Sequence, residues 1–401
     1  MEHSMQLAFT ADKNTFHLIS PQLKNIIAFN RQKLTIIVVH NIEPEANAAL
    51  FSQLEQEFAS YHQVEFKFHY LPASLQQEWG MPAKYTNHGI YLRLYLPRLG
   101  YHGRVLYLDL DLLCLGDLEA LYNYDLQGKS LGAVTDINNH LQRFNSKTFF
   151  DERFSLALQQ AGFGESKDYF NSGVLLIDLD ALEARGNPWV TRLNEIFSKG
   201  VFLHDQDFLN EIHLEDRVKL PVKYNYLTFC LIPQRHFLMY KEWDFTKISA
   251  PSEKQKFFAQ TELPVLVHFI GREKIHLHSH QEFKDIYAYF AEQTVEQIVQ
   301  RPVDFYQGMA LDFFTTFGYL AACYDFDLEA IDAFGKVTPA MIGKLQRGKP
   351  YNASPAVLNP YLIKSKTLSS FLTRIFASKK KRLAYAQKVY AKHANFFAKY
   401  H

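Results

Sequence analysis

The chain has 401 residues, of which 47% are hydrophobic and 21% are charged. This balance excludes a disordered chain, and the length predicts one large domain or two domains with a sizeable core. The three cysteines are widely spaced and form no C-x-x-C pattern, which favours neither a disulfide framework nor a zinc site. Neither a leader-like start nor 18 consecutive uncharged apolar residues occur, so we expect a cytoplasmic protein without a membrane span.

Charge is distributed unevenly along the chain. All 42 acidic residues lie at or before Asp332, whereas 14 of the 43 Lys and Arg residues lie after it. The formal net charge of +1 is therefore the balance of −13 up to Asp332 (29 basic less 42 acidic side chains) and +14 beyond it. Such asymmetry is typical of a basic arm that binds an anionic partner, either membrane headgroups or nucleic acid.

Short apolar runs and helical patterns succeed one another through the first half of the chain and predict an α/β fold. A helix is predicted at residues 45–61. Strands are predicted at residues 5–12, 34–41, 64–71, 104–111, 130–136 and 171–182.

The character changes to helix from about residue 281, where "QEFKDIYAYFAEQTVEQIVQ" has helical spacing. We therefore predict two domains, an α/β domain at residues 5–280 and a mainly α-helical, basic domain at residues 281–401. The latter ends in an amphipathic helix that contains the run Lys379–Arg382.

The run "RVLYLDLDLL" places Asp109 and Asp111 one residue apart at the end of the strand predicted at residues 104–111. On an extended backbone the two carboxylates would leave on the same side, roughly 6.6 Å apart. Two such acids repel each other unless a cation lies beside them, and Mn²⁺ or Mg²⁺ with oxygen ligands is the natural cation. These ions also bind phosphate oxygens, so the pair predicts a diphosphate-bearing substrate. A lone D-x-D also ends many strands in solvent without any such function.

Five further blocks accompany this pair in order: "MQLAFTADKN", "YLRLYLPRLG", "YFNSGVLLIDL", "HDQDFLN" and "VHFIGREKIH". Together the six blocks make residues 5 to 280 resemble glycosyltransferase family 8, which includes bacterial lipooligosaccharide galactosyltransferases and glycogenin. The resemblance implies a GT-A fold with a mixed central sheet, a UDP-hexose donor, Mn²⁺ and transfer with retention of the anomeric configuration. Mg²⁺ is the alternative ion.

The resemblance also implies roles for single residues. His268 would join Asp109 and Asp111 as a metal ligand, and Asp205 and Gln206 would be the catalytic residues beneath the anomeric carbon. A double displacement through Asp207 stays open beside front-face attack. The donor would be bound by Thr10, Ala11, Asp12, Asn14, Arg93, Leu110, Asp136, Asn171, Gly271 and Lys274. Ile275 and His276 depart from the Pro and Trp that follow the lysine in the family.

Structural alternatives exist for several of these residues. Arg93 could be a cation on a helix surface, Asn171 a strand-end cap, and Asp205 or Asp207 the cap of the helix in "QDFLNEIHL". A basic tail without a nucleic-acid-binding module favours an anionic membrane surface over nucleic acid, and docking on the acidic domain of the same chain is the alternative.

Two other functions fit parts of the sequence. The run "VLYLDLDLL" also resembles the first motif of haloacid-dehalogenase-like phosphatases, with Asp109 as nucleophile and Asp111 as acid and base. Leu113 departs from that motif, and no later acidic pair fits it. A non-catalytic nucleotide-sugar-binding protein is the third reading. Within the family resemblance, the acceptor would be a glycan on a surface glycoprotein, such as a serine-rich adhesin, or on a glycolipid.

Overall fold

The computed structural model describes residues 4–86, 88–136, 169–199, 204–213, 215–227, 264–270 and 281–317, with side chains at all of these except residues 199, 281–285 and 311–317. All residues beyond 317, including the basic tail after Asp332, lie outside these ranges. The helical character of that tail therefore stays a prediction.

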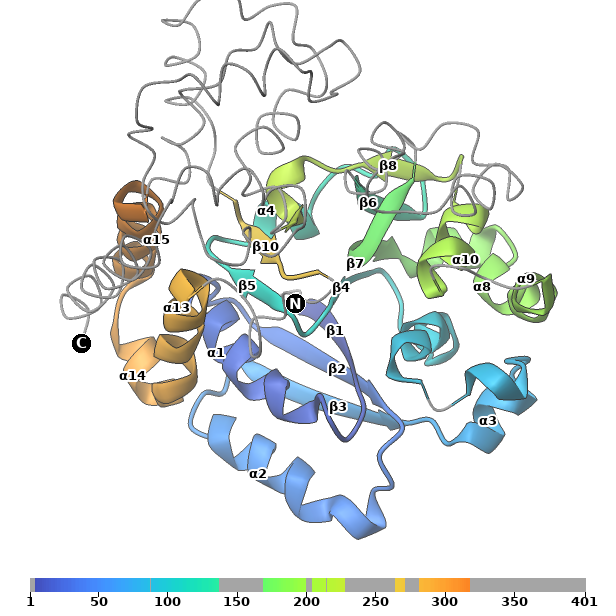
Figure 1. Cartoon of the computed structure of the whole chain (residues 1–401), viewed down its shortest axis with the longest axis horizontal. Coiled ribbons are helices and arrows are strands. Elements are labelled where there is room, and N and C mark those ends of the chain that lie inside the picture. The colour runs from blue at the N-terminus through green and yellow to red at the C-terminus, as the bar shows by residue number, and fades with distance from the viewer. Residues whose placement is uncertain are drawn as a thin grey trace, which may run out of the picture.

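A mixed seven-stranded sheet forms the centre of the fold (Figure 1), in the order β3-β2-β1-β4-β7-β6-β8. Its first four members in this order run parallel, whereas β7 is antiparallel to both of its neighbours. The strands are β1 (Met5–Ala11), β2 (Leu34–His40), β3 (Val64–Tyr70), β4 (Arg104–Leu108), β6 (Leu131–Thr135), β7 (Phe170–Asp178) and β8 (Arg217–Lys219). All six predicted strands are present, and the α/β class with a mixed sheet is confirmed.

The sheet separates two hydrophobic cores. Because side chains alternate along a strand, Leu7 and Phe9 of β1 enter one core and Ala8 enters the other. The first core is covered by α1 (Ile19–Phe29) and α2 (Ala48–Phe58). The second is covered by η4 (Gly89–Arg98), α8 (Pro188–Thr191), α9 (Leu193–Lys199) and α10 (Asp205–Ile212). The other short helices are η1 (Phe16–Leu18), η2 (Glu45–Asn47), α3 (Ala73–Glu78), η3 (Ala83–Tyr85), α4 (Glu119–Tyr122), α7 (Leu179–Ala184) and η6 (Val222–Tyr224).

A second, three-stranded sheet has the order β5-β10-β9, with β5 (Leu112–Cys114), β9 (Tyr226–Leu227) and β10 (Leu266–His268). The chain leaves the large sheet at Leu108 and enters the small one at Leu112, so it must bend between them. Asp109 to Asp111 lie in this bend. The prediction that both aspartates extend a strand is therefore wrong, because β4 and β5 belong to different sheets.

The helices after residue 280 pack beside α1 (Figure 1). They are α13 (Gln281–Glu292), α14 (Val295–Gln300) and α15 (Val303–Phe317). The single helical run predicted at residues 281–300 is interrupted because Thr294 and Gln297 form a capping box that starts α14.

Buried polar contacts fasten these helices to α1. Lys24 Nζ donates to the carbonyl oxygens of Ala291 and Gln293 at 2.9 and 3.0 Å. Phe290 and Ile298 belong to the same core as β1 and α1. These helices therefore extend the core of the large sheet, and the domain boundary near residue 280 stays a prediction.

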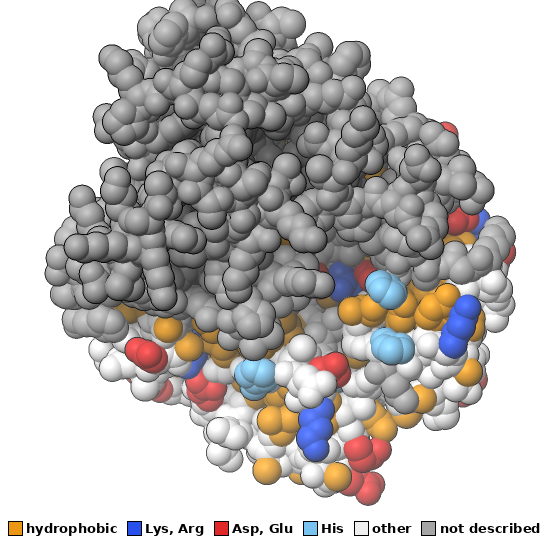
Figure 2. Space-filling model, viewed as in Figure 1, with side chains coloured by type: hydrophobic (Ala, Val, Ile, Leu, Met, Phe, Trp, Pro, Cys, Tyr) orange, Lys and Arg blue, Asp and Glu red, His pale blue; other side chains and the backbone are white. Residues whose placement is uncertain are grey.

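The described surface is of mixed charge. On the face in Figure 2, acidic, basic and histidine side chains are interspersed with hydrophobic ones. Across the described ranges, no helix combines the length and the apolar character needed to cross a bilayer.

Asp216 ties the edge strand β8 to the rest of the sheet. Its carboxylate accepts hydrogen bonds from the backbone N–H and the hydroxyl of Ser130 and pairs with Arg185 at 3.1 Å. Burial opposes its ionisation, but His213 and Ser130, with the charge of Arg185, outweigh burial and lower the pKa of Asp216 to about 2.

We predict that Asp216→Asn lowers the free energy of unfolding by on the order of 2 kcal/mol at pH 7 and 1 kcal/mol at pH 3. A depressed folded-state pKa contributes stability that is complete above the unfolded-state value near 4, and that is lost as the pH falls toward 2. Urea denaturation at the two pH values measures the effect. The exposed Asp304→Asn is the control, and an equal loss at both pH values would contradict the prediction.

Candidate active site

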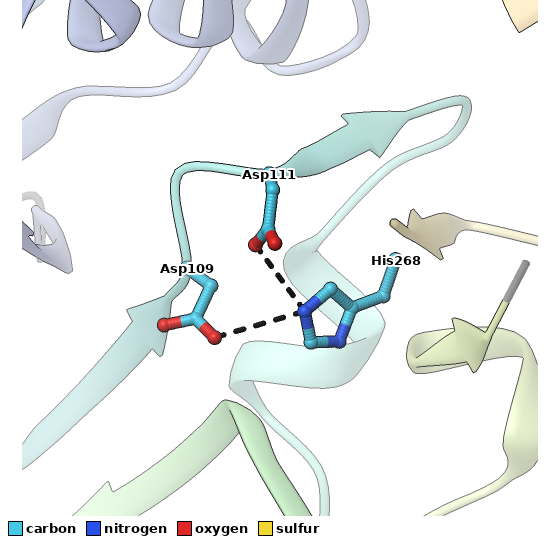
Figure 3. Close-up of side chains that lie close together, drawn as sticks. All are labelled: Asp109, Asp111 and His268. Atoms are coloured by element: carbon cyan, nitrogen blue, oxygen red, sulfur yellow. Dashed lines mark ion pairs between the residues drawn. The ribbon is translucent and has the colours of Figure 1, made fainter. Parts of the chain in front are cut away.

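Three potential metal ligands converge at the bend between β4 and β5 (Figure 3). The Nε2 atom of His268 lies 3.2 Å from Asp111 Oδ1 and 3.6 Å from Asp109 Oδ2. One ligand atom from each residue lies within 4.8 Å of the other two. Two carboxylate oxygens and one imidazole nitrogen form a donor set that suits a divalent ion such as Mn²⁺.

Strand pairing explains how a residue far along the chain reaches this bend. β10 pairs antiparallel with β5 and places His268 opposite Leu112, the residue after Asp111. The Phe269 N–H donates to the Asp111 carbonyl at 3.0 Å, which continues the pairing into the bend. On the other side, the Asp109 N–H donates to the Gly173 carbonyl of β7 at 2.8 Å.

Gly173 leaves room for these ligands. A Cβ atom at this position would lie 2.1 Å from His268 Cε1 and 2.9 Å from Asp109 Oδ2. Both distances are far shorter than ordinary van der Waals contact, so any side chain here would displace the imidazole. The backbone of β7 therefore forms a cradle that fits a metal-bound histidine and carboxylate.

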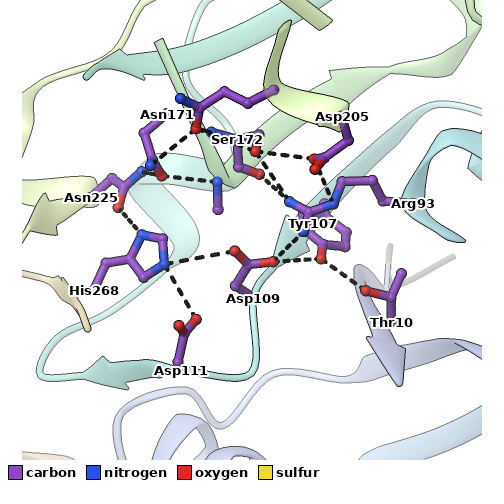
Figure 4. Close-up of polar contacts among 12 residues, drawn as sticks. Thr10, Arg93, Tyr107, Asp109, Asp111, Asn171, Ser172, Asp205, Asn225 and His268 are labelled. Carbon is purple, nitrogen blue, oxygen red and sulfur yellow. Dashed lines mark hydrogen bonds and ion pairs between the residues drawn. The ribbon is translucent and has the colours of Figure 1, made fainter. Parts of the chain in front are cut away.

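Arg93 joins the metal ligands to the neighbouring polar groups (Figure 4). It is 5% exposed, and its guanidinium pairs with Asp109 Oδ1 at 2.8 Å and with Asp205 Oδ2 at 3.2 Å. Burial lowers the pKa of Arg93, but the charges of Asp109 and Asp205 outweigh burial and raise it above its ordinary value. Its Nη1 atom also donates to the Ser172 carbonyl at 2.7 Å. The alternative of a cation on a helix surface is therefore wrong.

Tyr107 links the end of β1 to Asp109. Its hydroxyl donates to Asp109 Oδ1 at 2.6 Å and lies 3.0 Å from Thr10 Oγ1. Burial raises the pKa of Tyr107 well above its usual value, so the hydroxyl keeps its proton. The guanidinium of Arg93 stacks over the Tyr107 ring at 4.4 Å. Thr10 is thus connected to Asp109, a candidate metal ligand, through Tyr107.

Gln206 lies in a buried network of amides and carboxylates. Its Nε2 donates to Asp136 Oδ2 at 3.0 Å, and its Oε1 accepts from the Ser172 N–H at 3.0 Å and from Asn171 Nδ2 at 3.2 Å. Gln206, Asp136 and Asn171 are each 9% exposed or less. The structure therefore brings three of the residues implied by the resemblance into direct contact. Asn171 lies inside β7 and is not a strand-end cap.

Asp205 and Asp207 lie in the first turn of α10. The cap position is held by His204, which has a left-handed φ of 57° and makes no side-chain capping bond, so neither aspartate is the cap. Burial raises the pKa of Asp205, an effect that the charge of Arg93 opposes. Asp207 accepts a hydrogen bond from Tyr169 at 2.6 Å.

The other sequence-implied donor residues lie at the ends of β1 and β4. Ala11 ends β1, and Leu110 is a buried residue between the two aspartates. Asp12 Oδ1 accepts from the backbone N–H groups of Asn14 and Thr15 at 2.9 and 3.0 Å, so it shapes the loop. The Asn14 side chain is exposed. Two further residues, Gly271 and Lys274, lie outside the described residues.

Four further residues of this site were not predicted from the sequence. Tyr107 lies on β4 two residues before Asp109, which follows the strand, and this close spacing in the sequence was an available signal. Ser172 and Gly173 stand inside the quoted block "YFNSGVLLIDL" but were given no role. Asn225, whose side chain contacts His268 and Asn171, carried no sequence signal, because these two neighbours come from distant segments of the chain.

A sequence model described as Glycosyl transferase family 8 matches residues 6–275. The chain belongs to this family. The match to glycosyltransferase family 8 runs from β1 to β10 and therefore includes the bend between β4 and β5. The seven-stranded sheet with its attached helices is a GT-A glycosyltransferase fold. The expected family and fold are both confirmed.

Known proteins resemble the chain at modest identity. General stress protein A of Bacillus subtilis (strain 168) is 25% identical over 206 residues, which are 50% of this chain and 62% of that protein. Glycosyltransferase GlyF of Streptococcus pneumoniae serotype 4 (strain ATCC BAA-334 / TIGR4) is 27% identical over 231 residues, 57% of this chain and 50% of GlyF. The chain thus spans less than two thirds of these curated relatives.

One solved structure aligns along nearly its whole length. The galactosyltransferase LgtC, in complex with donor and acceptor sugar analogs, has a TM-score of 0.50 and 20% sequence identity. The match covers 74% of this chain and 98% of LgtC. At this identity the match establishes a shared fold.

We predict that Gly173→Ala weakens divalent-metal binding by about 100-fold, because the added methyl group displaces His268 from the two aspartates. Isothermal titration with Mn²⁺ measures the loss. Gly308→Ala is the matched control, since a Cβ there meets no atom within 4 Å. Parent-like Mn²⁺ affinity in folded Gly173→Ala would show that the cradle does not shape this site.

Proposed function

We propose that the chain transfers a hexose, galactose or glucose, from a UDP-sugar to a glycan acceptor with retention of configuration and with Mn²⁺. The observation that carries this proposal is the convergence of Asp109, Asp111 and His268 beside the buried network of Arg93 and Gln206. A metal-ligand cluster is thereby joined to groups that suit sugar hydroxyls. Membership of a glycosyltransferase family supports the same reading.

The nucleotide would lie across the ends of β1 and β4, where strand ends of α/β sheets commonly bind ligands. Thr10 to Asn14 border this place, with Asp12 offering a carboxylate to the uracil and Asn14 an amide to the ribose. Asp109, Asp111 and His268 would hold Mn²⁺, which neutralises charge on a departing diphosphate when it is bound. Gly271 and Lys274 would close over that diphosphate.

The hexose would lie against Arg93, Asp136, Asn171, Asp205 and Gln206. Buried donors and acceptors suit this task, because an unpaired buried hydroxyl or its partner costs about 1 to 3 kcal/mol. Gln206 is a weak nucleophile, and its Oε1 already accepts hydrogen bonds from Asn171 Nδ2 and from the N–H and hydroxyl of Ser172. We therefore propose front-face attack, in which the leaving diphosphate takes the proton of the acceptor and Gln206 faces the developing positive charge.

Two alternative functions differ in their support. The phosphatase reading requires Asp109 as a nucleophile, yet one oxygen of this carboxylate is held by Arg93 and Tyr107. Family membership also favours a transferase. A nucleotide-sugar-binding protein without turnover would bind UDP-hexose and Mn²⁺ but release no UDP, so the first experiment below separates it from a transferase.

For the acceptor we propose a bacterial surface glycan, on a serine-rich adhesin or on a glycolipid, which is modified in the cytoplasm before export. The basic run Lys379–Arg382 would hold the protein on the inner membrane surface. This part of the proposal is drawn from the sequence alone, because the tail lies outside the described residues.

We predict that Mn²⁺ stimulates UDP release from UDP-galactose or UDP-glucose, and that Asp111→Asn lowers this rate by about 100-fold or more. Asp111 is buried in the ligand cluster, whereas the exposed Asp117 six residues later supplies the matched control Asp117→Asn. A coupled UDP assay with and without chelator measures both. Unchanged release in Asp111→Asn would end the metal-dependent reading.

The tail gives a second prediction. Replacing Lys379 to Arg382 by glutamine should weaken binding to vesicles with anionic lipid at low salt, because each basic residue near such a surface contributes about 1 kcal/mol. Cosedimentation with anionic and with neutral vesicles measures the change. Equal sedimentation of variant and parent would exclude the membrane contact. It would not contradict the proposed transfer activity.

A further inference from the structure

Asn225 is a fully buried amide next to the candidate metal centre. It directly precedes β9, which pairs with β10, and its side chain is 0% exposed. Leaving a buried amide without hydrogen bonds is costly, so its contacts are expected to be specific. The Asn225 side chain lies between the imidazole of His268 and the amide of Asn171 and contacts both (Figure 4).

The contacts of Asn225 connect two parts of the site. Its Oδ1 atom lies 3.0 Å from His268 Nδ1, and its Nδ2 atom lies 2.9 Å from Asn171 Oδ1. Asn171 in turn donates through Nδ2 to Gln206 Oε1. A continuous row of side chains therefore runs from the metal ligand to the proposed sugar-binding amide of Gln206.

Backbone groups decide which end of each amide is oxygen. The Gly173 N–H donates to Asn171 Oδ1 at 3.0 Å, so this atom must be an acceptor. The Ser172 N–H does the same for Gln206 Oε1 at 3.0 Å. A flipped Asn225 would bring two oxygens together at Asn171, and its NH₂ group would face the imidazole. The two backbone N–H groups thus fix the orientation of the whole row.

This orientation decides the tautomer of His268. Asn225 Oδ1 can only accept, so the proton of the neutral imidazole must lie on Nδ1. The lone pair is then on Nε2, the atom that faces Asp109 and Asp111. Partners of this kind orient metal-bound histidines, and their loss typically weakens metal affinity by 10- to 100-fold.

We propose that Asn225 is a positioning residue that sets the tautomer of His268 and couples the metal centre to the sugar-binding amides. The inference rests on the proposed function. It gives Asn225 two roles, one for each end of its side-chain amide. The carbonyl end of Asn225 serves the metal, and the NH₂ end serves Asn171 and, through it, Gln206. The two ends predict different consequences for different substitutions.

Asn225→Ala removes both the carbonyl acceptor and the NH₂ donor of the side chain, whereas Asn225→Asp removes only the donor. The aspartate still accepts from His268 Nδ1, but it cannot donate to Asn171 Oδ1. We expect Asn225→Ala to weaken Mn²⁺ binding in the presence of UDP by about 10- to 100-fold. We expect Asn225→Asp to bind Mn²⁺ as tightly as the parent or tighter, while kcat for UDP release falls about tenfold or more, because two oxygens then meet where a buried hydrogen bond stood.

Electron paramagnetic resonance of free Mn²⁺ measures the affinity independently of turnover, and Asn30→Ala is the matched control. Asn30 is 1% exposed and hydrogen-bonds the Ile26 carbonyl and the Leu118 N–H, neither of which belongs to the candidate metal cluster. Its variant should lose stability without losing Mn²⁺ affinity.

The outcomes separate this inference from the proposed function. A parent protein that binds no Mn²⁺ with UDP overturns both. A parent that binds Mn²⁺, with Asn225→Ala binding equally well, overturns only the role of Asn225. If Asn225→Ala fails to fold, Asn225→Asp decides: weakened Mn²⁺ binding or parent-like kcat overturns the coupling, and retained binding with reduced kcat supports it.

Discussion

The pairing of β10 with β5 is the constraint on which the candidate site depends. Without it, His268 would have no reason to lie beside two aspartates more than 150 residues earlier in the chain. The pairing puts the histidine opposite the residue that follows Asp111, and a hydrogen bond from Phe269 extends the register into the bend. Two carboxylates held this close repel each other, and a cation between them and the imidazole relieves the repulsion.

The protein itself supplies part of that compensation. Arg93 pairs with Asp109 on the side away from His268, so one oxygen of this carboxylate is neutralised by the chain and the other stays directed at the metal centre. Arg93 also pairs with Asp205 at the start of α10. The buried guanidinium of Arg93 therefore fixes Asp109, a candidate metal ligand, relative to Asp205 of the proposed sugar site.

Much of the fold followed from local patterns in the sequence. Strands such as β2 and β7 are short apolar runs bounded by polar residues, and these runs fold as strands because both faces of the sheet are covered. The bend at Asp109 was missed because "VLYLDLDLL" is apolar on both sides of the aspartates. Only the pairing partners reveal that β4 and β5 belong to different sheets.

Site residues could be predicted from the sequence where the residue type itself indicates the role. They could not be predicted where the role depends on how distant segments pack together. Asp109, Asp111 and His268 could be named from the six ordered blocks, and the structure brings them together. The burial of Arg93 depends on acids from distant segments, and the need for glycine at position 173 depends on an imidazole that approaches from another sheet. Asn225 is of the same kind, since its neighbours His268 and Asn171 come from β10 and β7.

The central claim is that one imidazole and two carboxylates of this chain hold the divalent ion that faces the nucleotide. Pulsed electron paramagnetic resonance of the Mn²⁺–UDP complex tests it most directly, because it detects nitrogen bound to manganese. The account predicts a ¹⁴N coupling from one imidazole in the parent protein and its loss in His268→Gln. A parent spectrum without that coupling, or a coupling that survives in His268→Gln, would contradict the account.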